Sequence, residues 1–305
     1  MVLYPFTWPG SKYRARKFVT GHLPSNKPEG PVQTYVEPFG GSGVVMLNRD
    51  PAPVEVFNDL DSNLVTFFRV LRERPKELQR ALALTPYSRK EFEQACEADL
   101  SASGLDDLER ARLFFVRVQQ SVPMCGTAPP TSDWLYAIGS SRRGRSKNIS
   151  QEQSKVEGLL EVGSRFRRVQ LESRPYEDVI ERFDTPETLF YCDPPYPESI
   201  ANTSTDDRAY VEHLSEQDHR DLLTSLSNAE GMAAVSGFMN DLYIDVLDGM
   251  DTEWYVMFAD EQTSTANRKD TSVTRTNQEV LWTNYDPTEL SSDTPAPTAA
   301  QATLD

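Results

Sequence analysis

Short apolar runs that resemble β-strands alternate with amphipathic segments along most of this chain. The clearest example is 34-TYVEPF-39, which is followed by the glycine-rich stretch 40-GGSG-43 and then by an apolar run to residue 47. This order predicts a strand, a tight turn and a helix. Further strand-like runs lie at 54–59, 168–173, 188–193, 232–238, 253–259 and 278–285, and helical patterns at 63–84 with a break at Pro75, 88–100, 106–122, 175–183, 215–231 and 240–247. Such alternation predicts a doubly wound α/β sheet.

The pattern also predicts where the sheet domain is interrupted. We expect residues 1–75 and 166–286 to form the α/β domain and residues 76–165 to form a mostly helical insert. Within the insert, 123–150 is rich in Gly, Pro and Ser, which favours loops. No clear helix separates the last two strands, which favours an antiparallel pair at the sheet edge. Ser215 and Asp218 have the spacing of a capping box. The Thr-, Ala- and Pro-rich tail 287–305 is expected to be disordered.

The charge of the chain gives two opposing indications about its partner. The formal net charge is −16 and the pI is near 4.7, which argues against nucleic acid. However, only 8 of the 31 basic residues are lysine, and an acidic, lysine-poor composition is expected of a halophilic protein. At about 1 M salt the Debye length is roughly 3 Å, so net charge no longer acts at a distance. We therefore expect the protein to fold and work best in molar KCl. The net charge then does not identify the binding partner, which has to be inferred from the motifs.

Cysteine and histidine usage favours a reducing cytoplasm, which would be the host cytoplasm for a viral protein. The three cysteines form no CxxC pair, and the three histidines lie at no usual metal-ligand spacing, so we expect neither a disulfide framework nor a metal site. No apolar run approaches the length of a membrane span, and the N-terminus lacks a signal-peptide core.

The glycine-rich turn and the acid that follows the next strand indicate a cofactor site. Ligands of open α/β sheets bind at the carboxyl ends of strands, where glycines let the backbone approach closely. Asp59 ends the next strand and could accept the hydroxyl groups of a ribose, or it could cap the following helix. The third glycine of a pyrophosphate fingerprint is absent. This favours S-adenosylmethionine over NAD, although a plain tight turn remains an alternative.

The stretch 193-DPPY-196 follows an apolar strand and should project into the same crevice. Two prolines remove two backbone donors, so hydrogen-bond acceptors are in excess, and Asp193 adds another. Such a surface suits an exocyclic amine, and Tyr196 could stack on a flat ring. The alternative is a proline-stiffened turn.

Two further stretches carry candidate contacts. In 8-WPGSK-12, Trp8 could stack on a cofactor or an adenine and Lys12 could pair with a carboxylate, unless the stretch is only a surface turn with a buried tryptophan. The basic cluster 142-RRGRSK-147 supplies candidate phosphate contacts, or only a solvated charge run. Its basic residues are Arg142, Arg143, Arg145 and Lys147, and weaker candidates are Arg14, Arg16 and Lys17.

Together, and in this order, WPGSK, FGGSG, NDLDSN, an inserted middle and DPPY resemble the Dam-type (D12 class) DNA adenine-N6 methyltransferases of the α group. The resemblance implies a Rossmann-like methyltransferase sheet, S-adenosylmethionine as cofactor, double-stranded DNA as substrate, a monomer, and a partner restriction endonuclease if the enzyme belongs to a restriction-modification system. The resemblance also implies a role for each residue that stands at a matching position of these motifs. Trp8, Lys12, Phe39, Gly41, Gly43, Asp59 and Asp193 would bind the cofactor. Asp193 and Pro194 would act on the target amine, and Tyr196 would stack on the flipped base.

The sequence differs from the family pattern at one point, and three alternative functions stay open. We find no target-reading hairpin of the usual kind in 123–150, so the recognition sequence stays open. The rivals are methylation of cytosine N4 or of RNA, a catalytically inactive DNA-binding homologue, and an NAD enzyme. An intact Asp193 and Lys12 argue against the inactive homologue, and the incomplete phosphate fingerprint argues against NAD.

Overall fold

The computed structural model describes residues 2–27, 29–122, 133–139, 141–142, 144–195, 214–259 and 279–290. The chain divides into two compact units. The first contains the described residues of Met1–Ser11 and Asp59–Ser173. The second contains those of Lys12–Asn58, Arg174–Ala201 and Leu214–Asp305. None of the helices in these described ranges is both long and apolar enough to cross a lipid bilayer.

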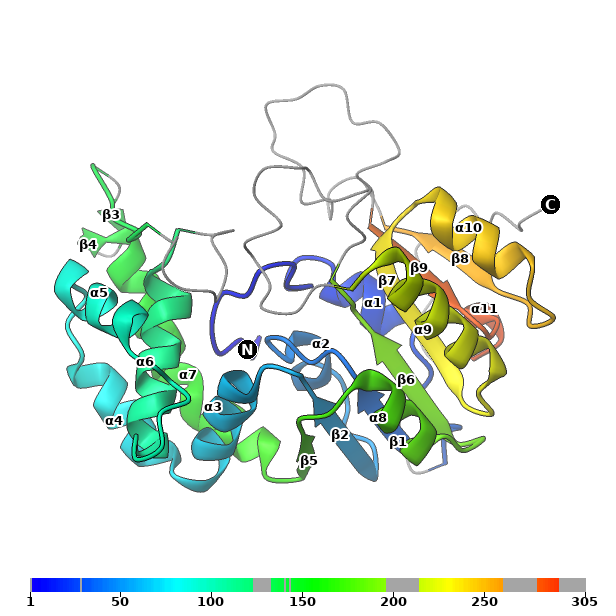
Figure 1. Cartoon of the computed structure of the whole chain (residues 1–305), viewed down its shortest axis with the longest axis horizontal. Helices are drawn as coiled ribbons and strands as arrows, with labels where there is room; N and C mark the ends of the chain where they lie inside the picture. Colours follow the sequence, from blue (N-terminus) through cyan, green and yellow to red (C-terminus); the bar gives the residue numbers. More distant parts are fainter. Residues whose placement is uncertain are drawn as a thin grey trace. The chain divides into compact units, whose positions relative to one another are not determined.

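A seven-stranded sheet is the main feature of the fold (Figure 1). Its order is β5-β2-β1-β6-β7-β9-β8, and six of these strands belong to the second unit. β1 pairs in parallel with β2 and β6, β6 pairs in parallel with β7, and β9 runs antiparallel to both β7 and β8. The strands are β1 (Thr34–Glu37), β2 (Val54–Asn58), β5 (Val169–Glu172), β6 (Thr188–Cys192), β7 (Met232–Phe238), β8 (Tyr255–Phe258) and β9 (Glu279–Thr283). The predicted α/β class and the antiparallel pair at the edge are confirmed.

The helices of the second unit pack on this sheet around a core that includes Phe190, Leu222 and Trp282. α8 packs against α9, and α9 packs against α10. The capping box is confirmed, because the Ser215 hydroxyl accepts from the backbone N–H of Asp218 and the Asp218 carboxylate accepts from that of Ser215. The helices are α1 (Arg16–His22), α2 (Val44–Leu47), α8 (Tyr176–Phe183), α9 (Glu216–Asn228), α10 (Asp241–Asp248) and α11 (Pro287–Leu290).

The first unit is mostly helical. α3 packs against α6 and α7, and α4 packs against α7, around stacked aromatic rings such as Phe68 and Phe166, whose centroids lie 4.2 Å apart. Pro75 begins α4, where its missing N–H costs nothing. The elements are α3 (Ser62–Glu73), α4 (Pro75–Leu84), α5 (Arg89–Glu97), α6 (Asp107–Gln120), β3 (Ser141–Arg142), β4 (Arg145–Ser146) and α7 (Lys147–Phe166).

The structure differs from the sequence expectations in the middle of the chain and at its end. Within the stretch expected to form loops, β3 and β4 pair as an antiparallel hairpin with Gly144 at φ 75°. Lys147–Phe166 forms α7, which the polar composition of its first turns concealed. Helix α11 occupies the first four residues of the segment expected to be a disordered tail, so that expectation does not hold there. Residues 291–305 lie outside the described ranges.

The boundary between the two units also falls earlier in the chain than the expected insert. The first unit resumes at Asp59, inside the range 1–75 that the sequence assigns to the sheet domain. α3 packs on α6 and α7, and this packing groups it with the inserted helices.

Candidate active site

Two predicted site segments follow neighbouring strands at one edge of the sheet. β1 and β6 pair in parallel, with Val36 opposite Phe190. The glycine turn that follows β1 and the Asp193 segment that follows β6 therefore both leave the sheet at its carboxyl-terminal edge, where open α/β sheets bind their ligands.

The glycine turn after β1 has a backbone that side chains would obstruct. Gly41 and Gly43 have φ values of 51° and 63°, a left-handed conformation that favours glycine. At Gly40, an added Cβ would lie 2.3 Å from the ring of Phe57. The turn therefore presents bare backbone, which permits close approach of a ligand.

The end of β2 holds this turn in place. The Gly40 N–H donates to the Asn58 carbonyl at 2.8 Å, and the Asn58 amide donates to the Pro38 carbonyl at 2.8 Å. The Asn58 side-chain oxygen also accepts from the N–H of Arg174 at 2.9 Å. The ring of Phe39 packs against Tyr176 with centroids 5.4 Å apart.

Glu37, the last residue of β1, is a buried carboxyl group beneath the turn. One of its oxygens accepts from the Tyr35 hydroxyl at 2.7 Å and from the Met46 N–H in α2 at 2.8 Å. Burial raises the pKa of Glu37 to about 8, against the opposing effects of these two hydrogen bonds. Glu37 therefore anchors α2 as a protonated acid near neutral pH.

Asp193 and Lys12, both predicted site residues, form an ion pair. Lys12 Nζ lies 2.6 Å from Asp193 Oδ1. The lysine side chain is 3% exposed, whereas the aspartate side chain is 20% exposed. The Ser236 hydroxyl in β7 donates to the same aspartate oxygen at 3.4 Å and bonds the Tyr191 hydroxyl at 2.7 Å. Burial raises the pKa of Asp193 and the Lys12 ammonium opposes this shift.

Glu279, the first residue of β9, also contacts Lys12. Its Oε1 lies 3.3 Å from Lys12 Nζ, and its side chain is 4% exposed. Burial raises the pKa of Glu279 to about 7, and Lys12 opposes the shift. One ammonium group is therefore shared by two carboxyl groups.

The proline segment after Asp193 is backed by a buried histidine. Pro194 is buried, and His219 in α9 is fully buried with its Nδ1 2.9 Å from the Tyr243 hydroxyl. Burial lowers the pKa of His219 to about 4, and the backbone of Pro195 acts in the opposite direction. His219 is therefore neutral near pH 7 and lies against the Pro195 backbone.

The other predicted cofactor contacts belong to the first unit. Trp8 packs among aromatic rings, with its centroid 5.7 Å from that of Phe6 and 6.1 Å from that of Phe114. Asp59 directly follows β2, and its carboxylate accepts from the Asp61 N–H at 2.9 Å.

The candidate DNA contacts lie on the β3–β4 hairpin, at the start of α7, and in and just before α1. Arg142 and Arg145 are exposed on the β3–β4 hairpin, Arg145 donates to Gln153, and Lys147 is exposed at the start of α7. In the second unit, the Arg16 guanidinium in α1 lies 4.7 Å from the Tyr13 ring centroid, and Arg14 and Lys17 are exposed. Tyr196 and Arg143 lie outside the described residues.

Sequence reasoning missed Glu279, Ser236 and Glu37 as site residues. Each is a polar residue in a buried strand, at β9, β7 and β1 respectively. That signal was available, because a buried strand rarely carries an unpaired polar group. The contacts of Glu279 with Lys12 and of Ser236 with Asp193 depend on strand order, which the sequence did not specify.

Comparisons with known proteins agree with these observations. Residues 8–102 match the family model described as D12 class N6 adenine-specific DNA methyltransferase. The match includes Lys12, the glycine turn and Asp59, and it ends before Asp193.

The Type II methyltransferase M.MjaIII of Methanocaldococcus jannaschii is 26% identical over 215 residues, which cover 64% of this chain and 70% of that protein. The family match supports DNA adenine methylation, and the relative is a methyltransferase. The resemblance that the motifs indicate is thereby confirmed, because residues 8–102 of this chain are similar to the D12 class N6 adenine-specific DNA methyltransferases.

Proposed function

We propose that this protein is a site-specific enzyme that transfers a methyl group from S-adenosylmethionine to N6 of a flipped adenine in duplex DNA. The observation that carries the proposal is the placement of two segments. The bare glycine turn follows β1, and Asp193, paired with Lys12, follows the adjacent parallel strand β6. This placement supports a cofactor surface and an acceptor for the target amine at one sheet edge.

The residues at this edge fit S-adenosylmethionine. When bound, this cofactor supplies a methyl group on a positively charged sulfur. Asp193 and Glu279 both contact the Lys12 ammonium, so two carboxyl groups share one cation. Such an excess favours a cationic ligand. Phe39, Gly41 and Gly43 would hold the methionine moiety, and Trp8, Lys12 and Asp59 would complete the cofactor contacts.

Asp193 and the Pro194 carbonyl would accept the two hydrogens of the target amine. The lone pair of adenine N6 is delocalised into the ring, and two acceptors draw the hydrogens into a geometry in which the lone pair points at the methyl group. The 20% exposure of Asp193, which contrasts with the burial of Lys12, leaves it accessible to a substrate.

DNA binding would rely on local contacts. Flipping a base costs a few kcal/mol, and stacking on Tyr196 would offset about 1–3 kcal/mol of this. Arg142, Arg143, Arg145 and Lys147 would contact phosphates, which positions the duplex without reading its sequence.

The test is transfer of labelled methyl from S-adenosylmethionine to unmethylated duplex DNA, followed by digestion to nucleosides. We expect label in N6-methyladenosine, lost in Asp193→Ala and retained in Asp245→Ala, a control at an exposed position on α10. Label in N4-methylcytosine would overturn the base assignment. DNA binding without transfer at 0.1 M or molar KCl would support an inactive homologue.

A further inference from the structure

The two faces of the sheet around β6 and β7 differ in polarity. Phe190 and Cys192 of β6 and Val235 of β7 belong to the apolar core. Side chains alternate along a strand, so Tyr191 and Ser236, which are neighbours of these residues in sequence, lie on the opposite face. Both side chains are buried. A buried hydroxyl group is unfavourable unless it is hydrogen-bonded, so each of the two needs a polar partner.

The hydroxyl groups of Tyr191 and Ser236 form a directed chain that ends at Asp193. Tyr191 Oη lies 2.7 Å from Ser236 Oγ, and the Ser236 hydroxyl donates to Asp193 Oδ1 at 3.4 Å. A serine hydroxyl has one hydrogen to donate, and an ionised carboxylate can only accept. Because Ser236 gives its hydrogen to Asp193, the Tyr191 hydroxyl donates to Ser236. The chain therefore connects the carboxylate that follows β6 to a tyrosine buried within the same strand.

The donors that described residues supply to Asp193 contact one oxygen of its carboxylate. Lys12 Nζ lies 2.6 Å from Oδ1, and the Ser236 hydroxyl donates to the same atom. Two donors from different parts of the fold restrict the rotation of a carboxylate more closely than one donor does. Among the described residues none donates to Oδ2, and the aspartate side chain is 20% exposed. The arrangement leaves Oδ2 to accept from a ligand while Lys12 stays on Oδ1.

We propose that Ser236 and Tyr191 are positioning residues that hold Oδ1 of Asp193 so that Oδ2 accepts a hydrogen of the target amine. The proposal rests on the proposed function of Asp193, and it assigns neither hydroxyl group a contact with substrate. Ser236 fixes the orientation of the carboxylate, and Tyr191 acts only through Ser236. Lys12 keeps its bond to Oδ1 throughout.

The bond from Ser236 also favours the ionised form of Asp193. Burial raises the pKa of Asp193, and Lys12 and the Ser236 hydroxyl oppose this shift. Loss of the hydroxyl should raise the pKa further, which leaves less of the carboxylate able to accept at a given pH. The other titratable groups of the described residues that interact with Asp193 are Glu37, Tyr191, Cys192, Tyr243 and Glu279.

The experiment measures single-turnover methyl transfer to adenine at saturating S-adenosylmethionine and DNA, together with the dissociation constant of the cofactor. We expect Ser236→Ala to slow transfer about tenfold and Tyr191→Phe about threefold, because each removes one hydrogen bond of the chain. The dissociation constant of the cofactor should change less than about twofold. Because both hydroxyl groups act through Oδ1, the double variant should be about as slow as Ser236→Ala alone.

Two buried hydroxyl groups elsewhere in the second unit provide matched controls. Ser227→Ala removes a hydroxyl in α9 that accepts from the indole N–H of Trp254 at 3.1 Å. Tyr285→Phe removes a hydroxyl that donates to the His22 carbonyl at 3.2 Å. Each control loses one buried hydrogen bond, as the test variants do, and should leave the transfer rate within about twofold of wild type.

The pH profile of transfer separates positioning from a general structural loss. The wild-type rate should fall at low pH as Asp193 takes up a proton, and in Ser236→Ala this fall should begin at a higher pH. The two control variants should keep the wild-type profile. Tyr191→Phe keeps the buried ring, so its rate and profile carry the test if Ser236→Ala does not fold.

Three results would overturn the inference. They are a test variant with the wild-type rate, a Ser236→Ala profile that is not shifted, and losses that multiply in the double variant. Wild-type protein that methylates no adenine contradicts the proposed function instead, so the two failures are distinguishable.

Discussion

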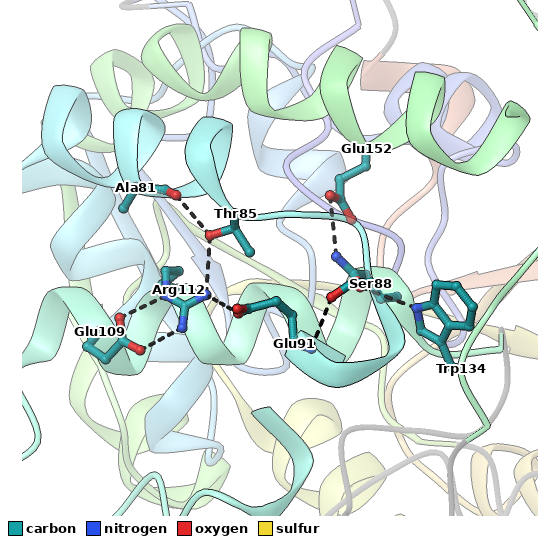
Figure 2. A network of polar contacts seen from close by, with 9 residues as sticks. Ala81, Thr85, Ser88, Glu91, Glu109, Arg112, Trp134 and Glu152 are labelled. Carbon is teal, nitrogen blue, oxygen red and sulfur yellow. Dashed lines mark hydrogen bonds and ion pairs between the residues drawn. The ribbon is translucent and has the colours of Figure 1, made fainter. Parts of the chain in front are cut away.

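Each unit contains a cation between two carboxyl groups, and the two clusters differ in how the carboxyl groups share that cation. In the helical unit, Arg112 donates to Glu109 at 2.7 and 2.8 Å, to Glu91 at 3.1 Å and to the Thr85 hydroxyl at 3.2 Å (Figure 2). In the second unit, Lys12 is shared unequally by Asp193 and Glu279. The planar guanidinium fixes one arrangement, whereas the ammonium is a compact charge that can exchange partners. The first cluster joins the end of α4 to α5 and α6, and the second joins Lys12 to the ends of β6 and β9.

The largest expected effect of breaking either cluster is that of Lys12→Met. Removing one partner of a buried ion pair costs about 3–5 kcal/mol, because the other charges stay buried without compensation. We expect a loss of this size in the free energy of unfolding at pH 8, measured by urea denaturation. At pH 5 the loss should be smaller, because Asp193 and Glu279, whose pKa values are raised, take up protons.

The control for this variant is Lys17→Met, which removes an exposed lysine from α1. It should change the free energy of unfolding by less than about 0.5 kcal/mol. A loss below 1 kcal/mol for Lys12→Met, or an equal loss at both pH values, would contradict the comparison.

A buried carboxyl group bonded by neutral donors should behave differently from one beside a cation. Burial raises the pKa of Glu37 from 4.5 to about 8, so the folded state binds its proton more tightly than the unfolded state does. Its contribution to stability is therefore present below pH 4.5 and is lost as the pH rises toward 8. We expect Glu37→Gln to reduce the wild-type decline over this range by a few kcal/mol, as measured by urea denaturation at several pH values. Equal slopes in the two proteins would show that Glu37 titrates as it does in the unfolded chain.

The smallest expected effect is that of Arg112→Met. Its side chain is 18% exposed and those of Glu91 and Glu109 are 26% and 43% exposed, so its ion pairs are worth only about 1 kcal/mol. We expect a loss of that size in 0.1 M KCl and a smaller loss in 1 M KCl, because salt screens exposed pairs. The loss for Lys12→Met should change little with KCl.

The control for Arg112→Met is Arg80→Met at an exposed position of α4, which should be near neutral at both salt concentrations. An Arg112→Met loss that grows with KCl would contradict the screening argument. The same titration tests the expected halophilic behaviour, because wild-type protein that is most stable and active at 0.1 M KCl would refute it.

The sequence predicted the elements that have a strong local pattern. β7 was placed at its observed bounds, because seven consecutive small or apolar residues form a buried strand, and the α9 capping box was identified from Ser215 and Asp218. The motifs singled out Lys12 and Asp193 as candidate site residues, and the structure brings these two side chains into contact.

The remaining features depend on contacts between distant parts of the chain. The apolar face of α7, formed by Val156, Leu159, Val162 and Phe166, follows a polar first half that reads as loop. The pairing of Glu279 with Lys12 joins two ends of the chain through the order of β6, β7 and β9. No local propensity encodes that order, so the sequence could indicate a buried acid but not its partner.

The antiparallel direction of β9 has a consequence for dividing the protein into fragments. Glu279 is held by its register with Phe238, where β9 enters the sheet. A separate peptide that begins at this residue would therefore deliver the carboxyl group together with the strand. Complementation of a chain cut before residue 279 by such a peptide would restore the sheet and the contact with Lys12 in one binding event, which makes this protein a candidate for division into two complementing fragments.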